Sequence, residues 1–140
     1  MRATKLLSVV IALFFLCGCA QESAIAFKSV TPKSDQVLRV GQRQHFVISA
    51  QYLAPDDGST IHLYLQDANN RKITPIQSFT PKAISGTVIF KIDAVVPDTQ
   101  YLGLSVAFFK KGQLETHLTD YREYDVVRAD GSTREAPSTN

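Results

Sequence analysis

Cysteine, tryptophan and methionine are scarce in this sequence, and the scarcity of cysteine and tryptophan excludes some classes of protein. The 140 residues include two cysteines, one methionine and no tryptophan. Both cysteines, Cys17 and Cys19, lie near the amino end, so the remainder of the chain has no thiol. This excludes a disulfide framework and a cysteine-based metal site from any domain that follows them.

An excess of charge of either sign is also missing. Lysine and arginine total 15, aspartate and glutamate total 13, and two of the bases, Arg2 and Lys5, precede an apolar run. Without those two, 13 bases face 13 acids. A neutral domain has no long-range field that attracts nucleic acid or anionic lipid, so we expect no nucleic-acid partner.

The apolar run is short. Residues 6–16 (LLSVVIALFFL) carry no charge, and no later stretch is longer and equally apolar. A helix that spans a bilayer needs about 20 apolar residues, whereas the core of a secretory signal peptide has this shorter length. The sequence therefore predicts a signal peptide over residues 1–18 and no membrane-spanning helix.

The run ends in Leu16, Cys17, Gly18 and Cys19, and this tetrad resembles the lipobox of bacterial lipoproteins. The resemblance implies that Cys19 receives a diacylglycerol thioether and that a signal peptidase cuts between Gly18 and Cys19. Cys17 would leave with the leader, so no Cys-x-Cys redox or metal site would remain. The alternative is an ordinary signal peptide that is cut near Ala20.

The resemblance also implies a location. In Gram-negative lipoproteins an aspartate after the lipidated cysteine retains the protein at the inner membrane, and here that position holds Ala20. We therefore expect a protein of the bacterial cell envelope, attached to the outer membrane and facing the periplasm, with residues 19–24 as the lipidated tether. In a Gram-positive source the same motif would mean the outer face of the only membrane. Buried acyl chains contribute about 0.8 kcal/mol per methylene, so several chains on one cysteine hold without a spanning helix.

Residues 25–127 read as a series of short strands separated by turn signals, with no sustained helical repeat. This pattern predicts an all-β fold, an antiparallel, immunoglobulin-like β-sandwich of about seven strands. The tail, residues 128–140, is polar and predicted to be disordered. The candidate strands cover residues 25–30, 36–40, 45–53, 60–66, 72–79, 86–95, 100–109 and 113–127.

Alternation within these runs predicts which side chains face the core. Pro75 restricts the run 72–79 to an edge strand, because proline lacks the N–H that a central strand needs. The residues expected to point inward are Phe46, Ile48, Ala50, Tyr52, Ile61, Leu63, Leu65, Val88, Phe90, Ile92, Leu102, Leu104, Val106 and Phe108.

The stretch 95–101 (VVPDTQY) resembles the corner before the sixth strand of fibronectin type III domains, through Pro97, Thr99 and Tyr101. The resemblance implies that the Tyr101 hydroxyl bonds back to the backbone. It also implies an inward Tyr101, which conflicts with an inward Leu102. We favour the apolar pattern, because a slip by one residue would expose large side chains to water. The absence of tryptophan and of internal cysteines excludes an antibody-type domain.

The residues typical of catalysis or metal binding form no recognisable constellation. The histidines His45, His62 and His117 fall on three different predicted strands, so no pair has the spacing of a metal site. Residues 67–70 begin like a calcium loop but lack its later glycine and glutamate, and a turn fits better. The nucleophile, zinc-protease and phosphate-loop motifs are absent. We expect no enzyme activity, no cofactor and no metal.

One surface is a candidate for binding a partner. If the large residues of 100–109 face inward, the small residues between them face outward and form a shallow trough. Aromatic and imidazole groups of neighbouring strands would flank this trough, and such a surface suits an extended peptide or a partner's side chains. The expected flanking residues are His62, Tyr64, Phe109 and His117; the expected floor is Gly103, Ser105 and Ala107.

These observations lead to an expected role. The chain reads as a lipid-anchored binding or accessory module of the cell envelope, with the membrane and another envelope protein as its partners. A structural subunit of an envelope complex is the first alternative. A hydrolase of envelope polymer is the second, and the lack of a catalytic motif disfavours it.

Overall fold

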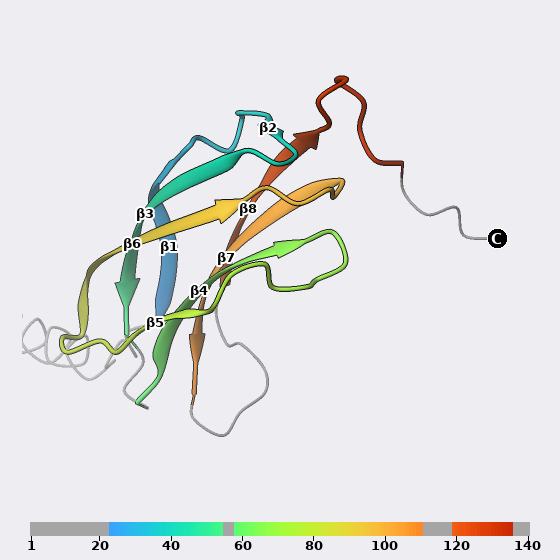
Figure 1. Ribbon diagram of the computed structural model, residues 1–140. Coiled ribbons are helices and arrows are strands. Elements are labelled where there is room, and N and C mark those ends of the chain that lie inside the picture. The colour runs from blue at the N-terminus through green and yellow to red at the C-terminus, as the bar shows by residue number, and fades with distance from the viewer. Residues whose placement is uncertain (1–22, 55–57, 111–118, 136–140) are drawn as a thin grey trace, which may run out of the picture.

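The computed structural model describes residues 23–54, 58–110 and 119–135, and these form strands and no helix. The all-β prediction is confirmed, with eight strands where about seven were expected (Figure 1). The strands are β1 (Ala24–Thr31), β2 (Leu38–Arg39), β3 (Arg43–Leu53), β4 (Thr60–Asp67), β5 (Gln77–Phe79), β6 (Ser85–Val95), β7 (Tyr101–Phe109) and β8 (Thr119–Val127).

The strands form two sheets that pack face to face. One sheet has the order β1-β3-β6, and the other has the order β2-β8-β7-β4-β5. All pairings are antiparallel except that of β2 with β8, which is parallel. The chain crosses between the sheets after β1, β2, β3, β5 and β6, whereas β4 with β5 and β7 with β8 are sequence neighbours that pair in the larger sheet. The predicted sandwich is confirmed.

The core lies between the sheets and is built by alternation along each strand. In β4, Ile61, Leu63 and Leu65 are fully buried, and the residues between them are half-buried on the other face. Burying one such side chain contributes about 1.5–3 kcal/mol, so the period-two pattern strongly favours this register. Every residue expected to point inward is buried in the structure.

The connection from β4 to β5 is held by a buried carboxylate. Asp67 is 2% exposed and accepts hydrogen bonds from the backbone N–H groups of Asn69 and Arg71 and from the Arg71 guanidinium. Asn70 adopts a positive φ of 60°, as expected for a turn residue. The strand that follows is shorter than expected, because pairing with β4 begins only at Gln77, after Pro75.

The corner before β7 departs from the fibronectin-type expectation. Leu102 is buried while Tyr101 lies half-buried on the outer face, so the apolar pattern fixes the register. The side chain that ties this corner is that of Thr99, which accepts a bond from the Ala68 N–H and donates to the Tyr101 carbonyl. A buried tyrosine hydroxyl does bond to backbone elsewhere: Tyr124 of β8 donates to the Pro32 carbonyl over 2.8 Å.

The segment after β8 turns back onto the corner between β6 and β7. The Arg128 guanidinium donates to both carboxylate oxygens of Asp98, over 3.0 and 3.2 Å, and Arg134 donates to the Asp98 carbonyl. These bonds lie at the end of the sandwich from which the carboxyl-terminal segment leaves (Figure 1). The part of the predicted tail over residues 128–135 is thus placed beside the sandwich.

Several sequence predictions fall outside the described residues. They are the signal peptide with its cleavage position at Gly18 and Cys19, the lipidation of Cys19, and the place of His117. Residues 19–22 of the predicted tether, 113–118 of the last predicted strand and 136–140 of the predicted tail also lie outside them. Within the described ranges, no helix has the length and apolarity needed to cross a bilayer.

Candidate functional site

The outer face of the five-stranded sheet collects most of the residues singled out in the sequence. Strand β7 lies at its centre, and its register sets Ala107 opposite His62 and Ser105 opposite both Tyr64 and Tyr121. Small residues in the middle strand leave room above the sheet for the larger side chains of β4 and β8. We call the group His62, Tyr64, Phe109 and Tyr121 the aromatic face.

The small residues expected to form the floor of a shallow trough point outward as predicted, but they are not exposed. Gly103 is buried, Ser105 is 6% exposed and Ala107 is fully buried, although all three point away from the core. Larger side chains of neighbouring strands lie over them, so the small residues form a covered floor. The reason is packing, because bulky rings fill the space that glycine and alanine leave between them.

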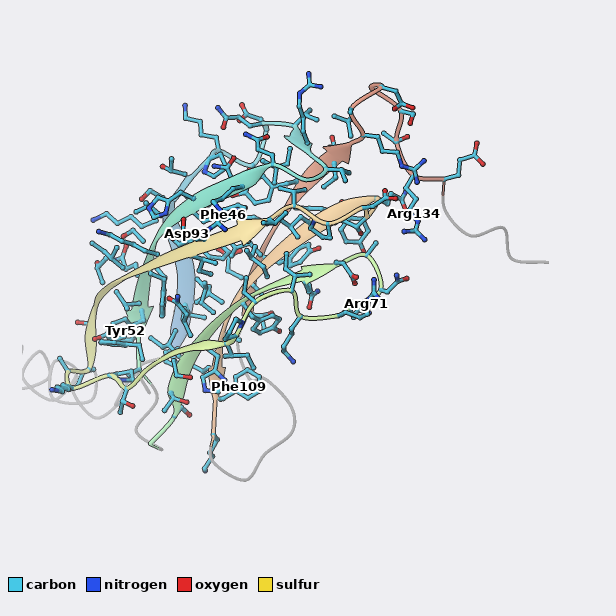
Figure 2. The ribbon with its side chains drawn as sticks, viewed as in Figure 1. Phe46, Tyr52, Arg71, Asp93, Phe109 and Arg134 are labelled. Atoms are coloured by element: carbon cyan, nitrogen blue, oxygen red, sulfur yellow. The ribbon has the colours of Figure 1, made fainter. Side chains whose placement is uncertain are left out.

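His62 and Phe109 form one half of the aromatic face. Their rings stack with centroids 4.4 Å apart and planes inclined by 20°, and Phe109 lies at the end of β7 (Figure 2). The Nε2 atom of His62 lies 3.0 Å from the Thr60 hydroxyl oxygen, while Nδ1 is buried and has no hydrogen-bond partner among the described residues. Burial, and next the charge of Lys72, lower the pKa of His62, so the ring is neutral at pH 7.

Tyr64 follows His62 by two residues and therefore points to the same face of β4. The ammonium group of Lys72 lies 5.2 Å from the centroid of the Tyr64 ring, within the range of a cation–π contact. The ring is half-buried, and its register position is beside Ser105. Lys72 thus adds a positive charge to the margin of the aromatic face.

Tyr121 is the member of the aromatic face that sequence reasoning missed. Its ring covers Gly103 so closely that a Cβ atom on that glycine would lie 2.5 Å from the Tyr121 hydroxyl. The side chain remains 39% exposed, and its hydroxyl donates to Glu123 over 3.2 Å. Burial, and next the charge of Glu123, raise the pKa of Tyr121 to about 12. The usable signal was the alternation of β8, which places Tyr121 and Glu123 on one face.

The structure brings three of the four predicted face residues together: His62, Tyr64 and Phe109. The fourth, His117, lies outside the described residues. His45 lies on the other sheet, where its Nδ1 atom is 2.8 Å from an Asp93 carboxylate oxygen. No group of three or more potential metal ligands occurs within residues 23–54, 58–110 and 119–135.

A second surface feature is a hollow of about 380 Å³ beside β1 and β8. Three basic residues line it, Lys28, Lys33 and Arg122, together with the acid Asp35. Arg122 is already engaged, because its guanidinium donates to the Asp120 carboxylate and lies over the Phe27 ring.

The fold and this face together define a β-sandwich with a mixed aromatic and charged surface on its larger sheet. Neither a known protein family nor a curated protein sequence matches the chain.

Proposed function

We propose that the chain is a lipid-anchored module of the bacterial cell envelope that binds another envelope protein through its aromatic face. The observation that carries the binding role is the gathering of four rings on a sheet face that no other described layer covers. Tyrosine and other aromatic residues are enriched in protein interfaces, where their large area is buried at a low entropic cost.

The charges beside the rings suit a protein partner. Lys72 stands over Tyr64, and Glu123 accepts from Tyr121, so a positive and a negative group lie on the same face. Such a pattern gives orientation to a docked chain without a strong field of one sign. A neutral partner surface with matching polar groups fits better than nucleic acid or a charged polymer.

The anchor is proposed from the sequence motif. Lipidation of Cys19, with cleavage after Gly18, would attach the module to the outer membrane on its periplasmic side. The test is the variant Cys19→Ser in full-length protein, with a labelled fatty acid. We expect the variant protein to carry no label and to be released from the membrane fraction. Persistent labelling would show that Cys19 is not the acylated residue.

Binding is tested by removing two rings of the aromatic face. The double variant Tyr64→Ala, Phe109→Ala should lose the envelope protein that cross-links to the wild type in intact cells and is identified by mass spectrometry. A matched control, Val37→Ala with Ile84→Ala, removes side chains that are 54% and 69% exposed elsewhere. The control should keep the partner, and circular dichroism should show that both variants fold.

Partner capture and partner assembly distinguish the binding module from the structural subunit. Equal capture by wild type and the aromatic double variant contradicts binding through this face. A partner recovered in fixed stoichiometry and dependent on the chain for its own assembly would favour the structural subunit instead.

A further inference from the structure

Strand β6 forms one margin of the three-stranded sheet, and its outer edge has no strand beside it (Figure 1). The Ile84 carbonyl and the Val96 N–H form hydrogen bonds on the side of β3. The backbone N–H and C=O groups of the even-numbered residues therefore point to β3, and those of the odd-numbered residues point to the free edge. Among the described residues, one group bonds to this edge: the Gln77 side-chain amide donates to the Lys91 carbonyl over 2.8 Å.

The other three sheet margins carry protective features that β6 lacks. Strand β1 has a bulge after Phe27, and the Phe27 N–H donates to the Asp120 carboxylate. Strand β5 has three residues and lies between Pro75 and Pro81, while β2 has two residues. Natural proteins use bulges, prolines and short strands to block unwanted pairing. Strand β6 has eleven residues, no proline and continuous pairing with β3.

The side chains along the free edge of β6 form a self-complementary series. Reading along the exposed face, Ile89, Lys91, Asp93 and Val95 are apolar, basic, acidic and apolar, and the two apolar residues are 64% and 53% exposed. Read in the opposite direction, the series is again apolar, charged, charged and apolar, with the acidic and basic positions exchanged. An antiparallel second copy would therefore set apolar against apolar and base against acid.

We propose that two copies of the chain pair through β6, antiparallel and about a two-fold axis, with Ile89 opposite Val95 and Lys91 opposite Asp93. The two three-stranded sheets then join into one continuous sheet. The edge-facing residues supply about eight backbone hydrogen bonds, because each bonded pair exchanges two. The interface is isologous, so every contact occurs twice.

Neighbouring registers are disfavoured by the same charges. A shift by one bonded pair in one direction sets Lys91 opposite Lys91, and the opposite shift sets Asp93 opposite Asp93. Like charges directly opposite one another destabilise a strand pair. Pairing also requires the exposed amide of Gln77 to turn away from the Lys91 carbonyl, which then accepts from the second copy.

The test measures the mass of the full chain in a non-denaturing detergent by sedimentation velocity, with the detergent density-matched. We expect the wild type to sediment as a dimer at micromolar concentration. Lys91→Asp should sediment as a monomer, because it sets two acids against each other in both halves of the interface. Adding Asp93→Lys to that variant restores the opposite pairs and should restore the dimer.

Two further variants separate pairing from folding. Ile89→Pro removes an N–H that faces the edge and none that bonds β3, so it should give a folded monomer. Lys33→Asp makes the same charge change in the loop after β1 and should remain a dimer. A monomeric wild type, a dimer that persists in Lys91→Asp, or a double variant that stays monomeric would each overturn the proposal.

Discussion

Replacing Tyr124 by phenylalanine removes a single buried oxygen atom, and we expect it to lower the free energy of unfolding by about 1–3 kcal/mol. The Tyr124 hydroxyl donates to the Pro32 carbonyl over 2.8 Å, and both residues are buried. The variant keeps the ring, which packs edge-on against Phe46 at 5.6 Å between centroids. The loss therefore reports the hydrogen bond and the stranded carbonyl, with little contribution from packing.

The pH dependence gives an independent measure of the same hydroxyl. Burial raises the pKa of Tyr124 to about 12, from 10.0 for a free tyrosine. The folded state therefore favours the neutral hydroxyl, and this stability is fully present below pH 10 and lost as the pH rises from 10 to about 12. The pKa difference corresponds to roughly 3 kcal/mol, and the phenylalanine variant lacks this dependence.

The assay is urea unfolding of full-length protein at neutral pH and at a pH between the two values, with Tyr64→Phe as the control. That control removes the same atom from a half-buried tyrosine whose hydroxyl has no hydrogen-bond partner among the described residues. We expect the gap between wild type and Tyr124→Phe to be wide at neutral pH and to narrow at alkaline pH. Equal unfolding midpoints at neutral pH would refute the reasoning, and so would a gap that does not change with pH.

Two carboxylates give further predictions. Burial opposes the ionisation of Asp67, but hydrogen bonds from Arg71 and then Asn69 outweigh it and lower the pKa of this carboxyl group. The ionised carboxylate therefore stabilises the folded state above about pH 3.8, and this stabilisation is lost as the pH falls below that value. Asp67→Ala should cost about 1–3 kcal/mol in urea unfolding at neutral pH and remove this acid dependence, and an unchanged acid profile would contradict the assignment. The Phe27 N–H donates a hydrogen bond to the Asp120 carboxylate over 2.8 Å, and Asp120→Ala should remove this bond. The hydrogen exchange of the Phe27 amide, measured by NMR, should accelerate about tenfold, whereas Asp120→Asn should show a smaller effect, and equal rates in wild type and Asp120→Ala would contradict the contact.

The strands that build the core could be predicted because their pattern depends only on neighbouring residues. Alternation in β3, β4, β6 and β7 fixed which face is buried, since shifting any of them by one residue would expose several large side chains. The short pairing of β2 with β8 could not be predicted in the same way. It joins Leu38 to Val126, far apart in sequence, and two residues are too few to carry a periodic signal.

In the candidate site, too, the features that depend on one strand could be predicted and those that depend on two strands could not. His62 and Tyr64 share a face because they are two residues apart, and this required only the alternation of β4. The covering of Gly103 by Tyr121 required the register between β7 and β8, which no local pattern contains. At the corner around Thr99, the apolar pattern correctly predicted an inward Leu102. The hydrogen bond from Ala68 to Thr99 was not predictable in this way, because the two residues are 31 positions apart in the sequence.

The end-to-end arrangement of the sandwich gives the molecule a direction. Ala24, where β1 begins, pairs with Leu53, which pairs with Ser85, so these three mark one end. The bonds between Arg128 and Asp98 mark the other, and eleven residues of β6 at about 3.3 Å each separate the two by roughly 35 Å. If the chain is held at a membrane through the residues before Ala24, this end of the sandwich would face the membrane and the strands would extend away from it. The corner held by Arg128 and Asp98 would then lie at the end far from the membrane, while the outer faces of both sheets stay accessible from the side.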